Sequence, residues 1–306
     1  MNIKILKGDC IESLKKLKDK SINTCITSPP YWGLRNYNDE SKQLGMEDTP
    51  EEFTENLVKV FREVKRVLQD DGTVWLNLGD SYSSGGRTTT TNQSLRGDKE
   101  YGVTRPKPSK EIKPKDLIGI PWRVAFALQQ DGWYLRQDII WHKPNPMPES
   151  VRDRCTKAHE YIFLLSKNVK YYYDHEAIKE DAKYPDGPNS PHKIKAVDNV
   201  YSANLQKIGA NPKRNKRSVW TITTKPFKGA HFATFPKDLI EPCVLAGCPK
   251  GGTVLDPFGG SGTTGIVAAQ HDRNAVLLEL NQEYIDLANA RINKELGIFG
   301  QGVQND

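Results

Sequence analysis

Two short segments, far apart in the chain, carry residue types that could act on a small planar ligand. The first is TSPPYWG at 27–33, where two consecutive prolines remove two backbone N–H donors and leave a rim rich in hydrogen-bond acceptors. Ser28 adds a hydroxyl, and Tyr31 and Trp32 add aromatic faces. Such a rim suits a planar group with an amino substituent, because the oxygens accept from the NH2 group while a ring stacks on it. Taken alone, the segment also fits an ordinary proline-rich turn after a strand.

The second segment is VLDPFGGSGTTG at 254–265, which follows an expected strand and opens an expected helix. Its glycines allow a tight turn and a close approach of the backbone to a ligand. Glu279 ends the next expected strand, where an acid accepts hydrogen bonds from ribose hydroxyls in dinucleotide-like folds. No Lys-Ser/Thr follows the glycines as in a P-loop, so a nucleoside-containing ligand without a pyrophosphate is favoured. A plain tight turn remains the alternative for this loop alone.

The elements that must position these segments alternate between strand and helix patterns. Strands are expected at 4–6, 21–27, 73–78, 133–143, 160–166, 253–257 and 275–280, and helices at 10–18, 50–68, 121–130, 236–247, from about 262, and at 282–295. Asp71-Gly72 is expected to turn the chain between the second helix and the third strand. Only one more strand and helix follow the Gly-rich loop, so the N-terminal part must supply the other strands. We expect an α/β fold with a doubly wound, mostly parallel sheet that both ends of the chain close.

Two polar stretches interrupt this alternation. Residues 81–115 are rich in Ser, Thr, Gly and Lys and are predicted to form a long mobile loop. The stretch 203–228 contains no Asp or Glu, and its clustered basic residues predict contacts with nucleic-acid phosphates, with a solvated basic loop as the alternative. The residues expected to contact these phosphates are Lys213, Arg214, Lys216 and Arg217. Lys143 and Arg35 could also contact phosphates, or pair with an acid.

Composition limits the class of protein. The chain has 306 residues, a formal net charge of +6 and 37% hydrophobic residues, which fits a folded protein and is compatible with a polyanionic partner. No apolar run approaches the ~20 residues that a membrane span needs, and the N-terminus lacks the apolar stretch of a secretory signal. A cytoplasmic location is therefore expected. The five cysteines are odd in number and form no C-x-x-C pair, so neither a disulfide framework nor a structural zinc site is expected.

The combination of the two segments is more specific than either alone. SPPY near the start and DPFGGSG near the end resemble the S-adenosylmethionine-dependent DNA amino-methyltransferases, and their order resembles the β group of that family. HFATFP at 231–236 and Gly8-Asp9-Cys10 also look like family segments. The resemblance implies a Rossmann-like methyltransferase sheet with a permuted motif order. It also implies a catalytic domain at 1–167 and 229–306, with an inserted target-recognition region at 168–228.

The resemblance also implies a role for each matching residue. The target base would be held by Ser28, Pro29, Pro30 and Tyr31. The cofactor, S-adenosylmethionine, would be bound by Asp9, Cys10, Phe235, Pro236, Asp256, Pro257, Phe258, Gly260, Ser261, Gly262, Thr263 and Glu279. Within that set Glu279 would take the ribose hydroxyls, and Asp9 and Cys10 would border the adenine. No metal is required.

The expected chemistry follows from the weakness of the nucleophile. The lone pair of an amino group on cytosine or adenine is delocalised into the ring, so the protein must position the reactants and localise that lone pair. The Ser28 hydroxyl and the Pro29 carbonyl would accept the two amino protons, while Tyr31 stacks on the base. A base inside a duplex is inaccessible, so it must first be flipped out.

Several alternatives remain open at this point. Ser before Pro-Pro-Tyr resembles the cytosine-N4 enzymes, so cytosine N4 is favoured over adenine N6. Methylation at cytosine C5 would need a cysteine nucleophile, but Cys243 lies in an expected helix, where it is expected to pack. A DNA-binding regulator without turnover and an RNA methyltransferase are the alternatives of other kinds. Double-stranded DNA is the expected partner. A homodimer and a cognate restriction endonuclease are options that analogy with the family leaves open, and the sequence gives neither.

Overall fold

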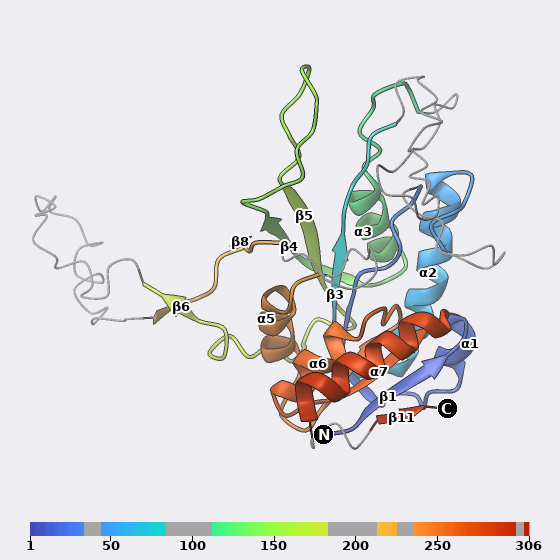
Figure 1. Cartoon of the computed structure of the whole chain (residues 1–306), viewed down its shortest axis with the longest axis vertical. Helices are drawn as coiled ribbons and strands as arrows, with labels where there is room; N and C mark the ends of the chain where they lie inside the picture. The colour runs from blue at the N-terminus through green and yellow to red at the C-terminus, as the bar shows by residue number, and fades with distance from the viewer. Residues whose placement is uncertain (34–43, 84–111, 183–212, 225–234, 298–302, 306) are drawn as a thin grey trace, which may run out of the picture.

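One sheet dominates the protein (Figure 1). The computed structural model describes residues 1–33, 44–83, 112–182, 213–224, 235–297 and 303–305. In these residues nine strands form a sheet in the order β11-β1-β10-β9-β2-β3-β5-β4-β8. Their bounds are β1 Ile3–Lys7, β2 Ile22–Thr27, β3 Leu68–Leu78, β4 Tyr134–His142, β5 His159–Ser166, β8 Val219–Thr221, β9 Thr253–Asp256, β10 Asn274–Glu279 and β11 Val303–Asn305.

Strand direction brings distant segments to one edge of the sheet. β1, β10, β9, β2 and β3 pair in parallel, and β1 also pairs in parallel with β11. β5 is antiparallel to both β3 and β4, and β8 is parallel to β4. The carboxyl ends of β1, β2, β3, β4, β9 and β10 therefore lie at the same edge as the amino end of β5.

Helices cover both faces of the sheet. α1 Cys10–Lys15, α2 Pro50–Val67 and α3 Ile120–Gln130 contribute to one buried cluster, and α5 Lys237–Gly247, α6 Thr263–Gln270 and α7 Gln282–Leu296 contribute to the other. The predicted doubly wound, mostly parallel α/β architecture is therefore confirmed. α2 shows how the sequence specifies a helix: Thr49 accepts from the Glu52 amide at 3.1 Å and Pro50 occupies the first turn.

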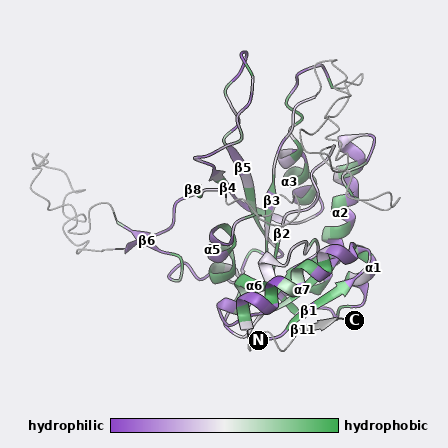
Figure 2. Ribbon diagram, viewed as in Figure 1, coloured by the Kyte–Doolittle hydropathy of each residue, from purple (hydrophilic) through white to green (hydrophobic). Residues whose placement is uncertain are grey.

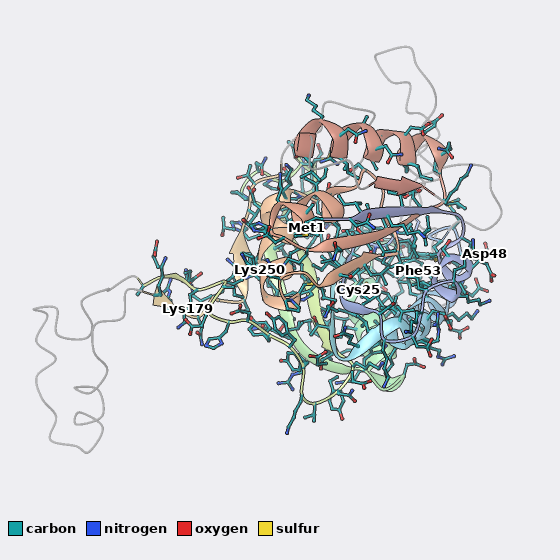
Figure 3. The ribbon with its side chains drawn as sticks, turned by 90° about the horizontal axis from the view of Figure 1, so that it is seen from below. Met1, Cys25, Asp48, Phe53, Lys179 and Lys250 are labelled. Atoms are coloured by element: carbon teal, nitrogen blue, oxygen red, sulfur yellow. The ribbon has the colours of Figure 1, made fainter. Side chains whose placement is uncertain are left out.

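The core lies between the sheet and these helices. Figure 2 shows hydrophobic colour along β1 and β3, whereas hydrophilic colour predominates around β6. Cys25 on β2 and Phe53 on α2 have no exposed surface and lie inside the body of the molecule (Figure 3). β6 Glu180–Asp181 and β7 Lys213–Arg214 form a separate two-stranded sheet. This two-stranded ribbon, here called the arm, projects away from the main sheet. Lys179, the residue before β6, is labelled in Figure 3.

The structure corrects the expected elements in a few places. α1 ends at Lys15 rather than near residue 18. β3 begins earlier than expected, at Leu68, but its pairing with β2 is interrupted where the turn at Asp71-Gly72 was expected. From Leu68 to Thr73 it advances five residues while β2 advances two, from Ile22 to Thr24, so the chain bulges here. The short strands β6, β7, β8 and β11 were not expected, since two or three residues carry no periodic pattern.

Several predictions fall on parts of the chain that are not described. Most of the predicted mobile loop at 81–115 lies outside the described residues, although its two ends meet in an antiparallel bridge between Tyr82 and Leu117. Arg35 and most of the HFATFP segment at 231–236 also lie outside them. Among the residues that were described, no helix is long and apolar enough to cross a membrane.

Candidate functional site

The ends of β9 and β2 form a topological switch point. From β9 the chain passes through α6 to β10, toward β1, whereas from β2 it passes through α2 to β3, toward β5. Because the two crossovers leave in opposite directions, they separate at the carboxyl ends of these adjacent strands, which is where ligands bind in open α/β sheets. SPPY follows β2 directly, and the Gly-rich loop follows β9 directly. The fold thus brings the two chemistry-bearing segments together.

A buried carboxylate joins these two strand ends. Asp256, with 1% of its surface exposed, accepts from the Thr27 hydroxyl at 2.6 Å and from the Thr264 hydroxyl at 2.7 Å. The Phe258 amide also donates to it at 3.1 Å. Burial raises the pKa of Asp256 above its ordinary range, and the three hydrogen bonds oppose that rise because they stabilise the ionised form. Both oxygens of Asp256 are therefore engaged within the protein, so it holds the Gly-rich loop and the start of SPPY in place.

Glu279 closes the other side of the Gly-rich loop. It accepts from the Gly260 amide at 2.8 Å and from the Asn281 amide at 2.9 Å. Burial raises the pKa of Glu279, and these backbone hydrogen bonds counteract the rise. Gly260 has a φ of +49°, a conformation that suits glycine. Each oxygen of the carboxylate has accepted one of these bonds, which leaves acceptor capacity for a further donor.

The Gly8-Asp9-Cys10 turn lies beside Glu279. The Gly8 amide donates to the Glu279 carbonyl at 3.0 Å. Asp9 caps α1 by accepting from the Ile11 and Glu12 amides at 2.9 and 3.0 Å. Burial raises the pKa of the Cys10 thiol to about 12, so it stays protonated at neutral pH. The turn that the sequence suggested for an adenine thus borders the acid suggested for the ribose.

An arginine that sequence analysis missed braces the Gly-rich loop from α7. Arg291 donates to the carbonyl and hydroxyl of Ser261, both at 2.6 Å, and to the Thr263 hydroxyl at 3.1 Å. Glu295, one turn further along α7, lies near Arg291 and is ion-paired with Lys237 at the start of α5. Phe235 and Pro236 directly precede Lys237, so α7 links two of the segments that were expected to bind the cofactor.

Tyr31 is the aromatic residue of SPPYW that the fold keeps at the site. A Cβ atom built on Gly79 would lie 2.6 Å from Cε2 of Tyr31, so the ring lies directly on the backbone after β3. Trp32 is instead buried in the core, where its indole donates to the Glu47 carbonyl at 2.8 Å. The expectation that both rings present faces to a ligand is therefore wrong for Trp32.

A network of side chains fixes the hydroxyl of Tyr31. The hydroxyl donates to Glu160 Oε2 at 2.7 Å, and Asn77 Nδ2 donates to the same oxygen at 3.2 Å. Lys143 forms an ion pair with the other oxygen, Oε1. Lys143 thus pairs with an acid, the second of the two options that the sequence left open. The sequence did not indicate this particular pair of side chains, because Tyr31 and Glu160 are 129 positions apart.

The expected DNA contacts are paired in this structure. Arg214 and Arg217 each donate to Glu180, at 2.9 and 2.6 Å, and Lys213 pairs with Asp181 at 2.6 Å. Lys216 lies over the Trp220 ring, with Nζ 5.1 Å from the ring centroid. Although 203–228 contains no acid, three of these four cations are paired, because β6 places Glu180 and Asp181 beside them.

Cys243 has the environment of a core residue. It has 1% of its surface exposed, and its thiol donates to the Leu239 carbonyl at 3.5 Å. Burial raises the pKa of this thiol well above its ordinary value, so a thiolate is not available at neutral pH. The expectation that Cys243 packs in the core is confirmed. In the part of the chain that the structure describes, no cluster of His, Cys, Asp or Glu could hold a metal ion.

Solved structures with the same fold include DNA methyltransferases. The PvuII DNA methyltransferase, described as cytosine-N4-specific, aligns with a TM-score of 0.64 at 18% identity, covering 100% of this chain and 95% of that chain. A protein from Thermus thermophilus, described as a putative DNA modification methylase complexed with S-adenosyl-L-methionine, aligns with a TM-score of 0.62 at 22% identity, covering 99% of each chain. These two similarities support the Rossmann-like methyltransferase fold.

Sequence comparison identifies the family. The type II methyltransferase M.SmaI of Serratia marcescens is 51% identical over 289 residues, which cover 94% of this chain and 90% of that protein. The type II methyltransferase M.Cfr9I of Citrobacter freundii is 48% identical over 291 residues, which cover 95% of this chain and 88% of that protein. The family model N6_N4_Mtase, described as DNA methylase, matches residues 22–290. With a match over most of its length and its two motif segments joined at one switch point, the chain belongs to the N6_N4_Mtase family of DNA methylases.

Proposed function

We propose that this DNA methylase transfers a methyl group from S-adenosylmethionine to the exocyclic amino group of a base flipped out of duplex DNA, with cytosine N4 as the preferred target. The observation that carries the proposal is the hydrogen bond from Thr27 to Asp256. It joins the residue before SPPY to the strand end that opens the Gly-rich loop. An amine-accepting segment and a nucleoside-binding segment therefore lie side by side, as a methyl transfer between them requires.

The residues at the Gly-rich loop fit the proposed cofactor. Glu279 is a buried carboxylate with acceptor capacity left for ribose hydroxyls. Beside it, a Cβ atom on Gly260 would meet, among the residues that the structure describes, only the Phe258 carbonyl within 4 Å, at 3.8 Å, so these residues leave room at this position. When bound, the cofactor supplies a methyl group on a positively charged sulfur. Asp256 would stabilise the conformation of the Gly-rich loop through its hydrogen bonds and would not contact the cofactor itself.

Ser28 and Pro29 are the proposed acceptors for the amino protons. Ser28 directly follows Thr27, whose side chain is anchored on Asp256, so its backbone position is tied to the cofactor loop. The Ser28 hydroxyl would accept a hydrogen bond from one amino N–H, and the Pro29 carbonyl would accept one from the other. The nitrogen would then become pyramidal, with its lone pair toward the methyl carbon, and the same two oxygens would stabilise the positive charge that develops on it. The N–C bond would form as the S–C bond breaks, which releases S-adenosylhomocysteine, and the methylated nitrogen would then lose one proton to solvent. Pro30 keeps the turn stiff, and Tyr31 stacks on the base.

Duplex DNA would be held by the region at 168–228. Flipping a base costs a few kcal/mol, which contacts with the phosphates must offset. Lys213, Arg214, Lys216 and Arg217 are the proposed phosphate contacts, and DNA would have to compete with Glu180 and Asp181 for three of them. Because the relatives are named type II methyltransferases, we further propose that the modification protects a recognition site from a cognate endonuclease.

The choice of cytosine rests on Ser28, since a serine at this position resembles the cytosine-N4 enzymes. The test is to incubate the protein with duplex DNA and labelled S-adenosylmethionine, digest the DNA to nucleosides and identify the product by mass spectrometry. N4-methylcytosine is the expected product. N6-methyladenine alone would overturn the choice of base, and DNA binding without any methyl transfer would favour a regulator. Faster methylation of RNA than of duplex DNA would overturn the choice of nucleic acid.

A further inference from the structure

Glu160 lies where three strands and the SPPY segment meet. It is the second residue of β5, and its register partner on β4 is Trp141. Asn77 approaches from β3, donating to Glu160 Oε2 at 3.2 Å and to the Tyr161 carbonyl at 3.0 Å. Tyr31 approaches from the segment after β2 and donates to the same Oε2 at 2.7 Å. The carboxylate thus ties the SPPY segment to the opposite half of the sheet.

Lys143 holds the other oxygen of this carboxylate. The Lys143 and Glu160 side chains are only 19% and 15% exposed, so the ion pair is largely shielded from water. The Lys143 ammonium also lies over the Trp141 ring, 4.2 Å from its centroid. With Lys143 on Oε1 and two donors on Oε2, the carboxylate is fixed from both sides. Such an arrangement lets Glu160 act on the orientation of Tyr31 rather than on a ligand directly.

Tyr31 is therefore held both at its ring face and at its hydroxyl, which also lies 3.4 Å from Asn77 Oδ1. Its face lies on the backbone of Gly79, and its hydroxyl is held by Glu160. A ring fixed in this way does not lose conformational freedom when a base stacks on it. A positioned group that moves by about 1 Å can cost about 10²-fold in rate, so an anchor of this kind matters for a reaction that depends on alignment.

We propose that Glu160, fixed by Lys143 and Asn77, is a positioning residue for methyl transfer, because it holds Tyr31 in the orientation in which the ring stacks on the flipped base. This inference rests on the proposed function. It concerns a linkage between residues 31 and 160 rather than a further contact with the substrate, and it does not depend on whether the base is cytosine or adenine.

The experiment compares Tyr31→Phe, Glu160→Ala, Glu160→Gln and the double variant Tyr31→Phe/Glu160→Ala. The measurements are the single-turnover rate of methyl transfer at saturating DNA and cofactor, the cofactor dissociation constant, and the thermal midpoint. DNA with 2-aminopurine at the target position reports base flipping by its fluorescence. Glu63→Gln is the control, because it removes a partly buried ion pair with Arg66 on α2, away from the site.

Tyr31→Phe and Glu160→Ala should each slow the single-turnover step by about 10-fold, because a loosened ring samples misaligned positions. Cofactor affinity should stay unchanged, and the double variant should be no slower than either single variant. Glu160→Gln should be faster than Glu160→Ala, since its amide oxygen can still accept from Tyr31. Glu63→Gln should turn over like the wild type.

Losses that multiply in the double variant would overturn the linkage, as would a wild-type rate in Tyr31→Phe. If Glu160→Ala does not fold, Tyr31→Phe and Glu160→Gln decide, because Tyr31→Phe removes one oxygen atom and keeps the ring. A wild-type protein that transfers no methyl group to DNA would contradict the proposed function instead. The linkage between Tyr31 and Glu160 would then be tested by the thermal midpoints. A decrease in the double variant equal to the sum of the decreases in the two single variants would contradict it.

Discussion

The two halves of the site are held by different kinds of contact. On the cofactor half, which comprises the Gly-rich loop and Glu279, the Glu279 carboxylate accepts from the backbone amides of Gly260 and Asn281. The Arg291 side chain also holds this loop, through Ser261. On the base half, Tyr31 is held by side chains of other strands, chiefly by Glu160. Backbone amides keep their places whatever the side chains are, whereas a side-chain network fails when one member is lost. The Glu279 contacts should therefore tolerate substitution of neighbouring side chains better than the Tyr31 network does.

Asp256 belongs to both halves. Its hydrogen bond with Thr264 lies within the segment of the Gly-rich loop, and its hydrogen bond with Thr27 reaches β2, the strand that leads into SPPY. Ser28, one residue further, belongs to the base half alone. Substitutions at these two positions should therefore separate the effect on the chemistry from the effect on the framework.

The largest effect is expected for Ser28→Ala. Loss of one of the two proposed amine acceptors should lower the methyl-transfer rate by about 10²-fold, in line with the loss of a single preorganised group that stabilises charge. Cofactor binding should be unchanged, because Ser28 does not belong to the Gly-rich loop. Single-turnover kinetics and calorimetric titration with the cofactor measure the two quantities. Ser21→Ala, which removes a hydroxyl bonded to the Lys18 carbonyl, is the matched control.

A loss of cofactor affinity in Ser28→Ala as large as the loss of rate would contradict this separation of the two halves.

Asp256→Ala should affect stability and cofactor binding together. It leaves the Thr27 and Thr264 hydroxyls without their acceptor, and a buried polar group without a partner costs about 1–3 kcal/mol. Removing a buried carboxylate offsets part of this, so we expect a loss of about 3 kcal/mol in the free energy of unfolding. Chemical denaturation measures this loss. Asp256→Asn keeps one acceptor oxygen and should lie between the wild type and Asp256→Ala.

If Asp256→Ala unfolds like the wild type and still binds cofactor normally, then Asp256 does not connect the two halves.

Glu279 allows a test by pH. Burial raises its pKa in the folded protein, so it takes up a proton at a higher pH than a free glutamate does. A protonated carboxyl is a poorer acceptor for ribose hydroxyls, so cofactor affinity should fall as the pH falls through this raised pKa. Between the ordinary and the raised pKa the folded state binds more protons than the unfolded state. The stability of the cofactor-free protein should therefore rise as the pH falls through the same interval.

Glu279→Gln should weaken cofactor binding at neutral pH by about 10-fold, the loss of one charge-assisted hydrogen bond. The substitution should also remove the contribution of Glu279 to the pH dependence of cofactor affinity and to the pH dependence of stability. This contribution is measured as the difference between wild type and variant, because Asp256 titrates in the same direction. Base flipping in Glu279→Gln should be unchanged at saturating cofactor, because Glu279 belongs to the cofactor half of the site. Unchanged cofactor affinity at all pH values would contradict the assignment of Glu279 to the ribose.

The same contrast explains what the sequence revealed. The position of Glu279 beside the Gly-rich loop could be predicted because the contact is local in the sequence: Gly260 and Glu279 are 19 positions apart, and Asp256 and Phe258 at the loop are 2 apart. Strand and helix periodicity placed the elements that carry them. The anchor of Tyr31 could not be predicted, because Glu160 is brought to it only by the antiparallel pairing of β3 with β5. Arg291 was missed for a similar reason, since its amphipathic helix carries no motif.

The basic stretch shows the same limit. From the sequence, 203–228 looked like a surface of unpaired cations. The pairing of β6 with β7 sets Glu180 opposite Arg214 and Asp181 opposite Lys213, across about 30 positions that no local pattern connects. The expectation of phosphate contacts now depends on how readily DNA displaces these acids, which can be measured.

The smallest effect is expected for Glu180→Gln. Glu180 accepts from Arg214 and Arg217, and the Arg217 side chain is 67% exposed, so these ion pairs contribute little to stability. If phosphates compete with Glu180 for the two guanidinium groups, its neutralisation should strengthen DNA binding by about 2–5-fold, which corresponds to a surface ion pair of about 0.5–1 kcal/mol. Glu176→Gln is the matched control, because Glu176 pairs with Lys179 at the base of the same arm.

The dependence of DNA affinity on salt separates a phosphate contact from a general change in charge. A phosphate contact contributes about −0.9 to the slope of log affinity against log salt concentration, so Arg217→Gln should make this slope shallower by about 1. Glu180→Gln should leave the slope as it is or make it steeper, whereas Glu176→Gln should resemble the wild type. Equal effects of Glu180→Gln and Glu176→Gln would mean that DNA senses only the net charge of the arm, and that Arg214 and Arg217 serve to close the β6–β7 ribbon.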